Sequence, residues 1–124
     1  MSKFRIEFEI SGLPKLINGG WGKSHWAVQA KYRREWRSLV SLIVATKRPD
    51  KPLNKAKLTL IRFSNTAPDP DNLAASFKHV IDGLVDAGVL VNDKYENIGM
   101  PNYLWEKTSP GKGKIKVIVE AAHD

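Results

Sequence analysis

The chain has 124 residues, with 20 Lys and Arg against 13 Asp and Glu and a formal net charge of +7. This length suits one domain, spanning residues 1–124, and leaves no room for a second catalytic module. The sequence has no cysteine, which excludes disulfides, thiolate zinc sites and cysteine nucleophiles.

The positive charge balance predicts attraction to polyanions such as nucleic acid. No stretch has the pattern of a signal peptide. The longest apolar run, Leu39 to Ala45, is far shorter than the about 20 residues that cross a bilayer. We therefore expect a cytoplasmic protein without a membrane partner.

The first half of the chain predicts a strand, a loop and a long helix. Residues Phe4–Ile10 alternate strictly between apolar and polar side chains, which indicates a half-buried strand. A loop rich in Pro, Asn and Gly follows, and a helix is expected from an N-cap at Ser24 to about Thr46. The predicted buried stripe of this helix comprises Val28, Tyr32, Trp36, Leu39, Val40 and Ile43.

Basic side chains crowd the same helix, on faces that we expect to point away from the apolar stripe. An ordinary solvated surface explains any one of them. As a cluster they are candidates for contacts with nucleic-acid phosphates. Together with a lysine just before the helix they are Lys23, Lys31, Arg33, Arg34 and Arg37.

The next elements are a second strand over Lys55–Phe63 and a second helix. This helix opens at Asp69 or Asp71 and ends near Gly88, a residue type that commonly ends helices. Its predicted buried stripe is Leu73, Phe77, Val80, Ile81 and Leu84.

Two strand-like runs complete the chain, Ile98–Lys107 and Lys114–Glu120. Residues 109–113 between them have the composition of a hairpin loop. The resulting order, β-α-β-α-β-β, predicts an α+β fold with one mixed sheet packed by two main helices.

Three acidic residues flank the second helix. Asp69 and Asp71 open it, and Asp93 follows it after a short return segment. Five residues of extended chain cover about 16 Å, which is enough to bring Asp93 back along most of the helix. Three carboxylates that meet in this way suit Mg²⁺, which prefers oxygen ligands and is commonly shared with substrate phosphates.

A purely structural explanation also exists for these acids. An Asp followed by Pro is a common helix start, and acids in a first turn complement the helix dipole. Asp93 also suits a simple turn in Val91-Asn92-Asp93-Lys94. The geometry permits the three carboxylates to converge but does not require it.

Lys78 and Asp82 extend the acidic constellation. On one continuous helix, Asp71, Lys78 and Asp82 lie within about 20° of a single line, beside the apolar stripe. A lysine aimed along the same face as Asp71 can neutralise a phosphate oxygen or a developing charge. Asp82 can pair with that lysine, support the site by hydrogen bonding, or face water.

The specific signal is a block of motifs between residues 69 and 93. They are Asp69-Pro70-Asp71-Asn72-Leu73, Lys78 with Val80-Ile81-Asp82-Gly83-Leu84, Asp86-Ala87-Gly88-Val89 and Val91-Asn92-Asp93. On these residues the chain resembles the RusA-type Holliday-junction resolvases, small endodeoxyribonucleases found in phages and prophages. Its amino-terminal strand, loop and basic helix are similar as well.

The resemblance implies a homodimer that resolves four-way DNA junctions by paired symmetric nicks in recombination and repair, with Mg²⁺ or Mn²⁺ and no organic cofactor. It implies a bacterial or phage-infected cytoplasm. It carries catalytic and metal-binding roles onto Asp69, Asp71 and Asp93, and the helper lysine onto Lys78. Many members instead place this lysine at the position of Ala75, and an acid at the position of Asn92.

The resulting hypothesis is metal-assisted phosphodiester hydrolysis on branched DNA. In it, Asn72 and Asp82 support the site, and the basic cluster holds the flanking duplex arms. Two alternatives stay open. One is a non-catalytic basic nucleic-acid-binding domain, and the other is a metal-dependent nuclease for flaps or other branched substrates.

Overall fold

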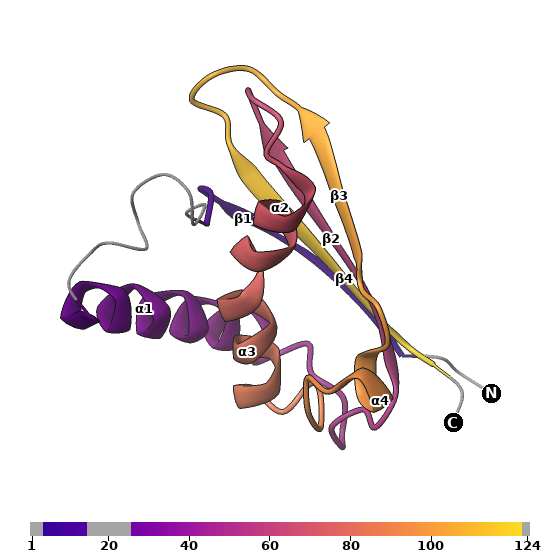
Figure 1. Ribbon diagram of the computed structural model, residues 1–124. Coiled ribbons are helices and arrows are strands. Elements are labelled where there is room, and N and C mark those ends of the chain that lie inside the picture. Colours follow the sequence, from indigo (N-terminus) through magenta and orange to yellow (C-terminus); the bar gives the residue numbers. More distant parts are fainter. Residues whose placement is uncertain (1–3, 15–25, 123–124) are drawn as a thin grey trace.

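The computed structural model describes residues 4–14 and 26–122, and in these ranges four strands form one mixed sheet in the order β1-β4-β2-β3. Figure 1 shows the helices α1, α2 and α3 together on one face of this sheet. The α+β class and the mixed sheet are therefore as predicted. The strands are β1 (Arg5–Ser11), β2 (Ala56–Ser64), β3 (Asn102–Lys107) and β4 (Lys114–Ala121). The helices are α1 (Trp26–Val44), α2 (Pro70–Ser76), α3 (Lys78–Asp86) and α4 (Tyr95–Ile98).

The last two strands do not form the predicted hairpin. β4 pairs antiparallel with both β1 and β2, while β3 pairs only with β2, and in parallel. β2 thus lies between β3 and β4, and residues 108–113 pass over its end (Figure 1). The reason is the helical segment between β2 and β3, because a long crossover returns the chain parallel to the strand it left.

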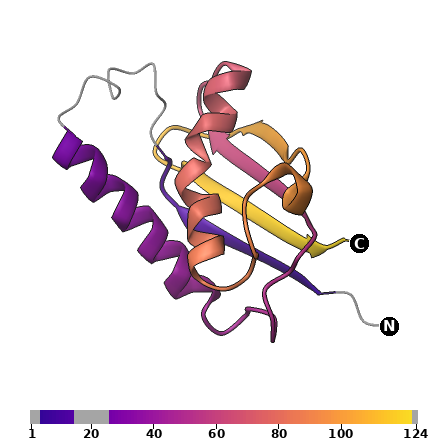
Figure 2. The same cartoon turned by 60° about the horizontal axis from the view of Figure 1, so that its bottom comes forward.

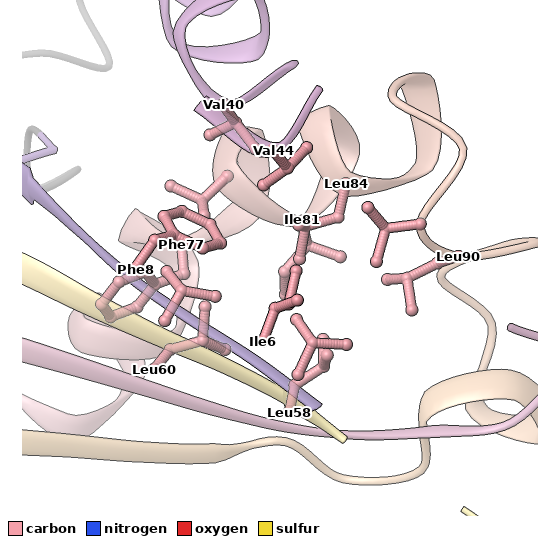
Figure 3. Packing of buried hydrophobic residues seen from close by; sticks show 14 of the residues in the cluster. Ile6, Phe8, Val40, Val44, Leu58, Leu60, Phe77, Ile81, Leu84 and Leu90 are labelled. Carbon is pink, nitrogen blue, oxygen red and sulfur yellow. The ribbon is translucent and has the colours of Figure 1, made fainter. Parts of the chain in front are cut away.

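The sheet contributes one layer of the core through alternate side chains of its strands. In β1 every second side chain is buried, and in β4 the buried positions are Ile115, Val117 and Val119. Figure 3 shows Ile6, Phe8, Leu58 and Leu60 rising from the sheet toward the helices. The opposite layer comes from α1, α3 and the segment after α3, through Val40, Val44, Phe77, Val80, Ile81, Leu84, Val89 and Leu90.

The predicted second helix is two helices, which separates Asp71 from the line through Lys78 and Asp82. The break falls at Phe77, whose backbone N–H donates to the carbonyl of Ala74, three residues back. Phe77 has φ −92° and ψ 2°, outside the helical values, and its side chain is fully buried. The chain therefore changes from α2 to α3 at a residue whose side chain lies in the core.

The buried face of α1 agrees with the prediction in part, because Trp36, Val40 and Ile43 of the expected stripe lie in or against the core. Val40 and Val44 are buried, but Val28 and Leu39 of the expected stripe are 52% and 37% exposed. The cause is a close approach between α1 and α3 at Gly83. A Cβ added at Gly83 would lie only 2.8 Å from the Val40 Cβ, so the glycine selects the face that α1 presents.

The predicted third strand begins later than expected. Residues 95–98 form the short helix α4, which Gly99 ends with φ +57°. Pro101 follows, and β3 begins at Asn102. Gly99 is needed here because a side chain strains a positive φ. Among residues 4–14 and 26–122, no helical segment has the length and apolar character of a bilayer-spanning helix.

We predict that Gly83→Ala destabilises the protein. The new methyl group must displace Val40 or the nearby Arg37 carbonyl, which lies 3.2 Å from its position. Overpacking of this kind costs about 1–3 kcal/mol, and better helix propensity returns up to about 1 kcal/mol. Urea unfolding should show a net loss of about 1–2 kcal/mol, and an unchanged or higher midpoint would show that α1 and α3 are not in close contact.

Candidate functional site

A single ammonium group joins two carboxylates from different elements. The Nζ of Lys78, the first residue of α3, lies 3.3 Å from Asp82 Oδ1 and 3.3 Å from Asp93 Oδ2. Burial alone would lower the pKa of Lys78, but the charges and hydrogen bonds of Asp82 and Asp93 outweigh it and raise the pKa. Lys78 is therefore a fixed positive charge at neutral pH.

The return of Asp93 toward the helix start depends on local anchors. Residues 89–91 are fastened to Leu53, whose N–H donates to the Val89 carbonyl and whose carbonyl accepts from the Val91 N–H. The Asn92 side-chain oxygen then accepts from the Asp93 backbone N–H at 2.8 Å. Asn92 thus holds the backbone of Asp93. This hydrogen bond needs only the side-chain oxygen of Asn92 and not the negative charge that an acid would bring to this position.

Asp69 and Asp71 lie at the start of α2. Asp69 is the N-cap and Pro70 the first helical residue, yet the Asp69 carboxylate makes no capping hydrogen bond. Asp71 is in the first turn, and both acids are exposed. Asn72 follows in the same turn, half-buried. Capping therefore does not account for the Asp69 side chain, which stays accessible to a cation or to water.

A pocket of about 380 Å³ connects α2 with Lys78 and Asp93. Ala75 of α2 also lines this pocket. Many RusA-type resolvases, which the sequence resembles, have their lysine at the position of Ala75, so a lysine at either position would border the same pocket. Asp71 precedes Ala75 by four residues, about 6 Å along an ideal helix. Asp93 thus returns to the space beside Ala75 and Lys78, while Asp69 and Asp71 are not part of the pocket lining.

The donor chemistry at this end of the fold suits a hard divalent cation, since carboxylate oxygens are the ligands that Mg²⁺ prefers. Within residues 4–14 and 26–122, however, no three acidic or histidine side chains form a group that would hold a metal ion. The nearest partner of Asp93 is the Lys78 ammonium rather than another acid. A site built from Asp69, Asp71 and Asp93 together stays a prediction.

The basic residues of α1 divide into two kinds. Arg37, expected to point away from the core helices, faces α3 and makes two hydrogen bonds to Asp86, at 2.6 and 2.8 Å. Lys31 lies 4.0 Å from Glu35. Arg33 and Arg34 form no ion pair within the described ranges. They line a groove of about 650 Å³ with Ser38 and Ser41. Lys23 lies outside the described residues.

The Arg37–Asp86 pair has a clear electrostatic effect on both groups. The hydrogen bond from Arg37 lowers the pKa of Asp86, and the reciprocal bond raises the pKa of Arg37. The charge of Arg37 is thus largely satisfied inside the protein. Sequence reasoning missed Asp86 as its partner because the two residues are 49 positions apart.

Two buried polar groups, in β2 and in α3, each have one nitrogen without a hydrogen-bond partner in the described ranges. Arg62 of β2 is 6% exposed and donates one hydrogen bond to the Pro14 carbonyl, while its Nε has no partner in the described ranges. His79 Nδ1 is buried without a hydrogen bond and lies 3.9 Å from Asp82 Oδ2. The signal for Arg62 was its inward position in the alternation of β2.

No protein-family model matches this chain, and no curated protein matches it.

We predict that the stability of the protein falls as His79 becomes protonated. Burial is the main cause that lowers the pKa of His79. Asp82 opposes it, and the charges of Arg33, Lys78 and Arg37 lower the pKa further. Because the folded-state pKa lies below the unfolded value of 6.5, the stabilisation is complete above that pH and is lost as the pH falls through the folded-state pKa.

The measurement is urea unfolding of the wild type and of His79→Gln between about pH 7.5 and 5.5, where unperturbed histidine titrates. The wild type should lose stability on acidification, and the variant should show a flatter dependence. Parallel curves would mean that His79 titrates normally in the folded protein.

Proposed function

We propose that this protein is a Mg²⁺-dependent endonuclease that cuts four-way DNA junctions. The observation that carries the proposal is the contact of Lys78 with Asp93 and Asp82 beside the carboxyl end of α2. It supports a site in which carboxylates and a fixed cation face one phosphate. Mn²⁺ would serve in place of Mg²⁺.

Each side chain has a distinct role in the proposed reaction. Asp69, Asp71 and Asp93 would hold the metal, which supplies a polarised phosphate and an activated water when bound. Lys78 stabilises the negative charge that develops on the phosphate oxygens. Asp82, one turn along α3, keeps the lysine in place when Asp93 is engaged elsewhere.

Helix α3 relates the proposed site to the basic groove of α1. Lys78 begins this helix and Asp86, which contacts the groove, ends it. Eight residues of helix measure about 12 Å, or between three and four base-pair steps of duplex DNA. Phosphates that flank the cut would thus reach Arg33 and Arg34 while one phosphate lies at Lys78.

We further propose that the protein acts as a homodimer. A four-way junction has approximate two-fold symmetry, and two identical sites related by a two-fold axis would produce paired cuts. A non-catalytic DNA-binding domain is the main rival, because Asp93 is already neutralised by Lys78 in the absence of a metal. The two functions differ in whether any nick forms.

The test is a nicking assay on a synthetic four-way junction with Mg²⁺. We expect Asp71→Asn to reduce nicking by at least about 100-fold, equivalent to about 2.7 kcal/mol of transition-state stabilisation. Junction binding should stay intact or tighten because one repulsive charge is removed. Lys78→Met should also reduce the rate.

Asp50→Asn is the matched control, because Asp50 is exposed in the connection after α1 and undergoes the same loss of charge. Linear duplex, flap and single-stranded substrates at equal salt distinguish junction cutting from other nuclease activities. Full nicking by Asp71→Asn would refute the metal site, and the absence of nicks with every metal and substrate would favour the rival.

We also predict different contributions from the arginines of α1. Each phosphate contact adds about 0.9 to the slope of log affinity against log salt. Arg34→Gln should lower the slope by about this amount, whereas Arg37→Gln should lower it less because Arg37 is bound to Asp86. Fluorescence anisotropy of a labelled junction at several salt concentrations measures both, and equal slope changes would show that the Arg37–Asp86 pair opens on binding DNA.

A further inference from the structure

The pocket beside Lys78 has features that phosphate chemistry does not explain. Most of its lining is apolar, including Ala74, Ile98 and Pro101, and two tyrosines border it. Tyr95 is 79% exposed and borders the pocket, so its ring face is accessible to a ligand. The polar groups Lys78 and Asp93 occupy one part of the lining.

Tyr103 is the rigid wall of this pocket. Its ring stacks on the buried Phe77 ring, with centroids 6.1 Å apart and planes at 26°. Burial raises the pKa of Tyr103 and the Lys78 charge opposes this rise, so the phenol stays neutral at physiological pH. Its hydroxyl is available as a hydrogen-bond donor close to the Lys78 ammonium.

We infer that this pocket binds an unpaired nucleobase of branched DNA, stacked on Tyr95 and bordered by Tyr103, while Lys78 binds the phosphate of the same nucleotide. The inference rests on the proposed function for the source of that base. A volume of about 380 Å³ is within the range of small-ligand pockets and accommodates one base with its sugar.

The occupant follows from the apolar walls, the two tyrosine rings and the Lys78 ammonium, which is paired with the Asp93 carboxylate in the structure. Every base has an aromatic face, and stacking on protein aromatics is a common way to bind single strands without reading their sequence. A protein of net charge +7 favours a polyanionic ligand over a neutral aromatic peptide. Removing a base from its stack costs least where pairing is already interrupted, as at a strand exchange.

The first experiment maps the contact directly. A four-way junction with 5-iodouracil at the crossover is irradiated with the full-length protein in Ca²⁺, and the attached peptide is identified by mass spectrometry. We expect attachment at Tyr95 or Tyr103, and none with a linear duplex of the same sequence. Attachment only within α1 would overturn the inference.

The second experiment measures the affinity of the pocket for a single-stranded oligonucleotide and does not depend on cleavage. A short oligothymidylate is titrated into labelled protein and followed by NMR, with expected shifts at Ala74, Gly99 and Tyr103. Tyr95→Ala should weaken binding about five- to 100-fold, the loss of one base–aromatic stack, whereas Tyr95→Phe should bind as the wild type does.

Leu104→Ala is the matched control. Leu104 is also a large exposed side chain, but it follows Tyr103 in β3 and thus points to the opposite face of the sheet. Its affinity should equal that of the wild type. Unchanged affinity in Tyr95→Ala, with the fold verified by thermal melting, would disprove the base pocket.

The two proposals fail in different ways. Normal junction nicking by a protein whose pocket binds no oligothymidylate would leave the nuclease and remove the base pocket. Oligothymidylate binding that depends on Tyr95, in a protein that nicks no branched substrate, would support the base pocket and remove the nuclease.

Discussion

The burial of Phe77 determines the geometry of the whole candidate site. Its side chain is fully enclosed between the sheet and α3, and it stacks on Tyr103 of β3. To reach this position the chain tightens for one turn, which ends α2 and begins α3 with Lys78. Phe77 therefore directly precedes the lysine that contacts Asp93 and stacks on the tyrosine that borders the pocket. In Figure 2, α2 and α3 follow one another over the sheet with a bend between them.

Local patterns in the sequence predicted the elements, whereas the contacts between elements decided the errors. Alternation in β1 and β4 depends only on neighbouring residues, so those strands were found within one or two residues. The pairing of β3 with β2 depends on the path of the crossover, and residues 109–113 carry no information about it. The buried face of α1 is the face that packs closely against Gly83, which lies 43 positions after Val40. Apolar periodicity within α1 carries no information about this contact.

The same distinction applies to the candidate site. Spacing singled out Asp69, Asp71, Lys78 and Asp93 because Asp71 and Lys78 share one face of the predicted helix and the chain after that helix can return Asp93 toward its start. The ion pair between Lys78 and Asp82 was foreseeable, since both lie on one helix face four residues apart. The partner of Arg37 and the hydrogen bond of Asn92 were not, because each requires the three-dimensional path of the chain. The base pocket is also invisible in sequence, since α2, α4 and β3 each contribute part of its lining.

Charge compensation along α3 suggests how such a site remains stable without its ligand. Lys78 pairs with both Asp82 and Asp93, and Arg37 pairs with Asp86, so the acids of α3 and of the return segment each have a cation nearby. Asp69 and Asp71 form no ion pair in the described ranges, although they carry like charges one residue apart. In a chain of net charge +7, the first turn of α2 is thus a local concentration of negative charge that the fold leaves uncompensated. Both acids are exposed to water, where this repulsion is weak, and a divalent cation bound as proposed would relieve it.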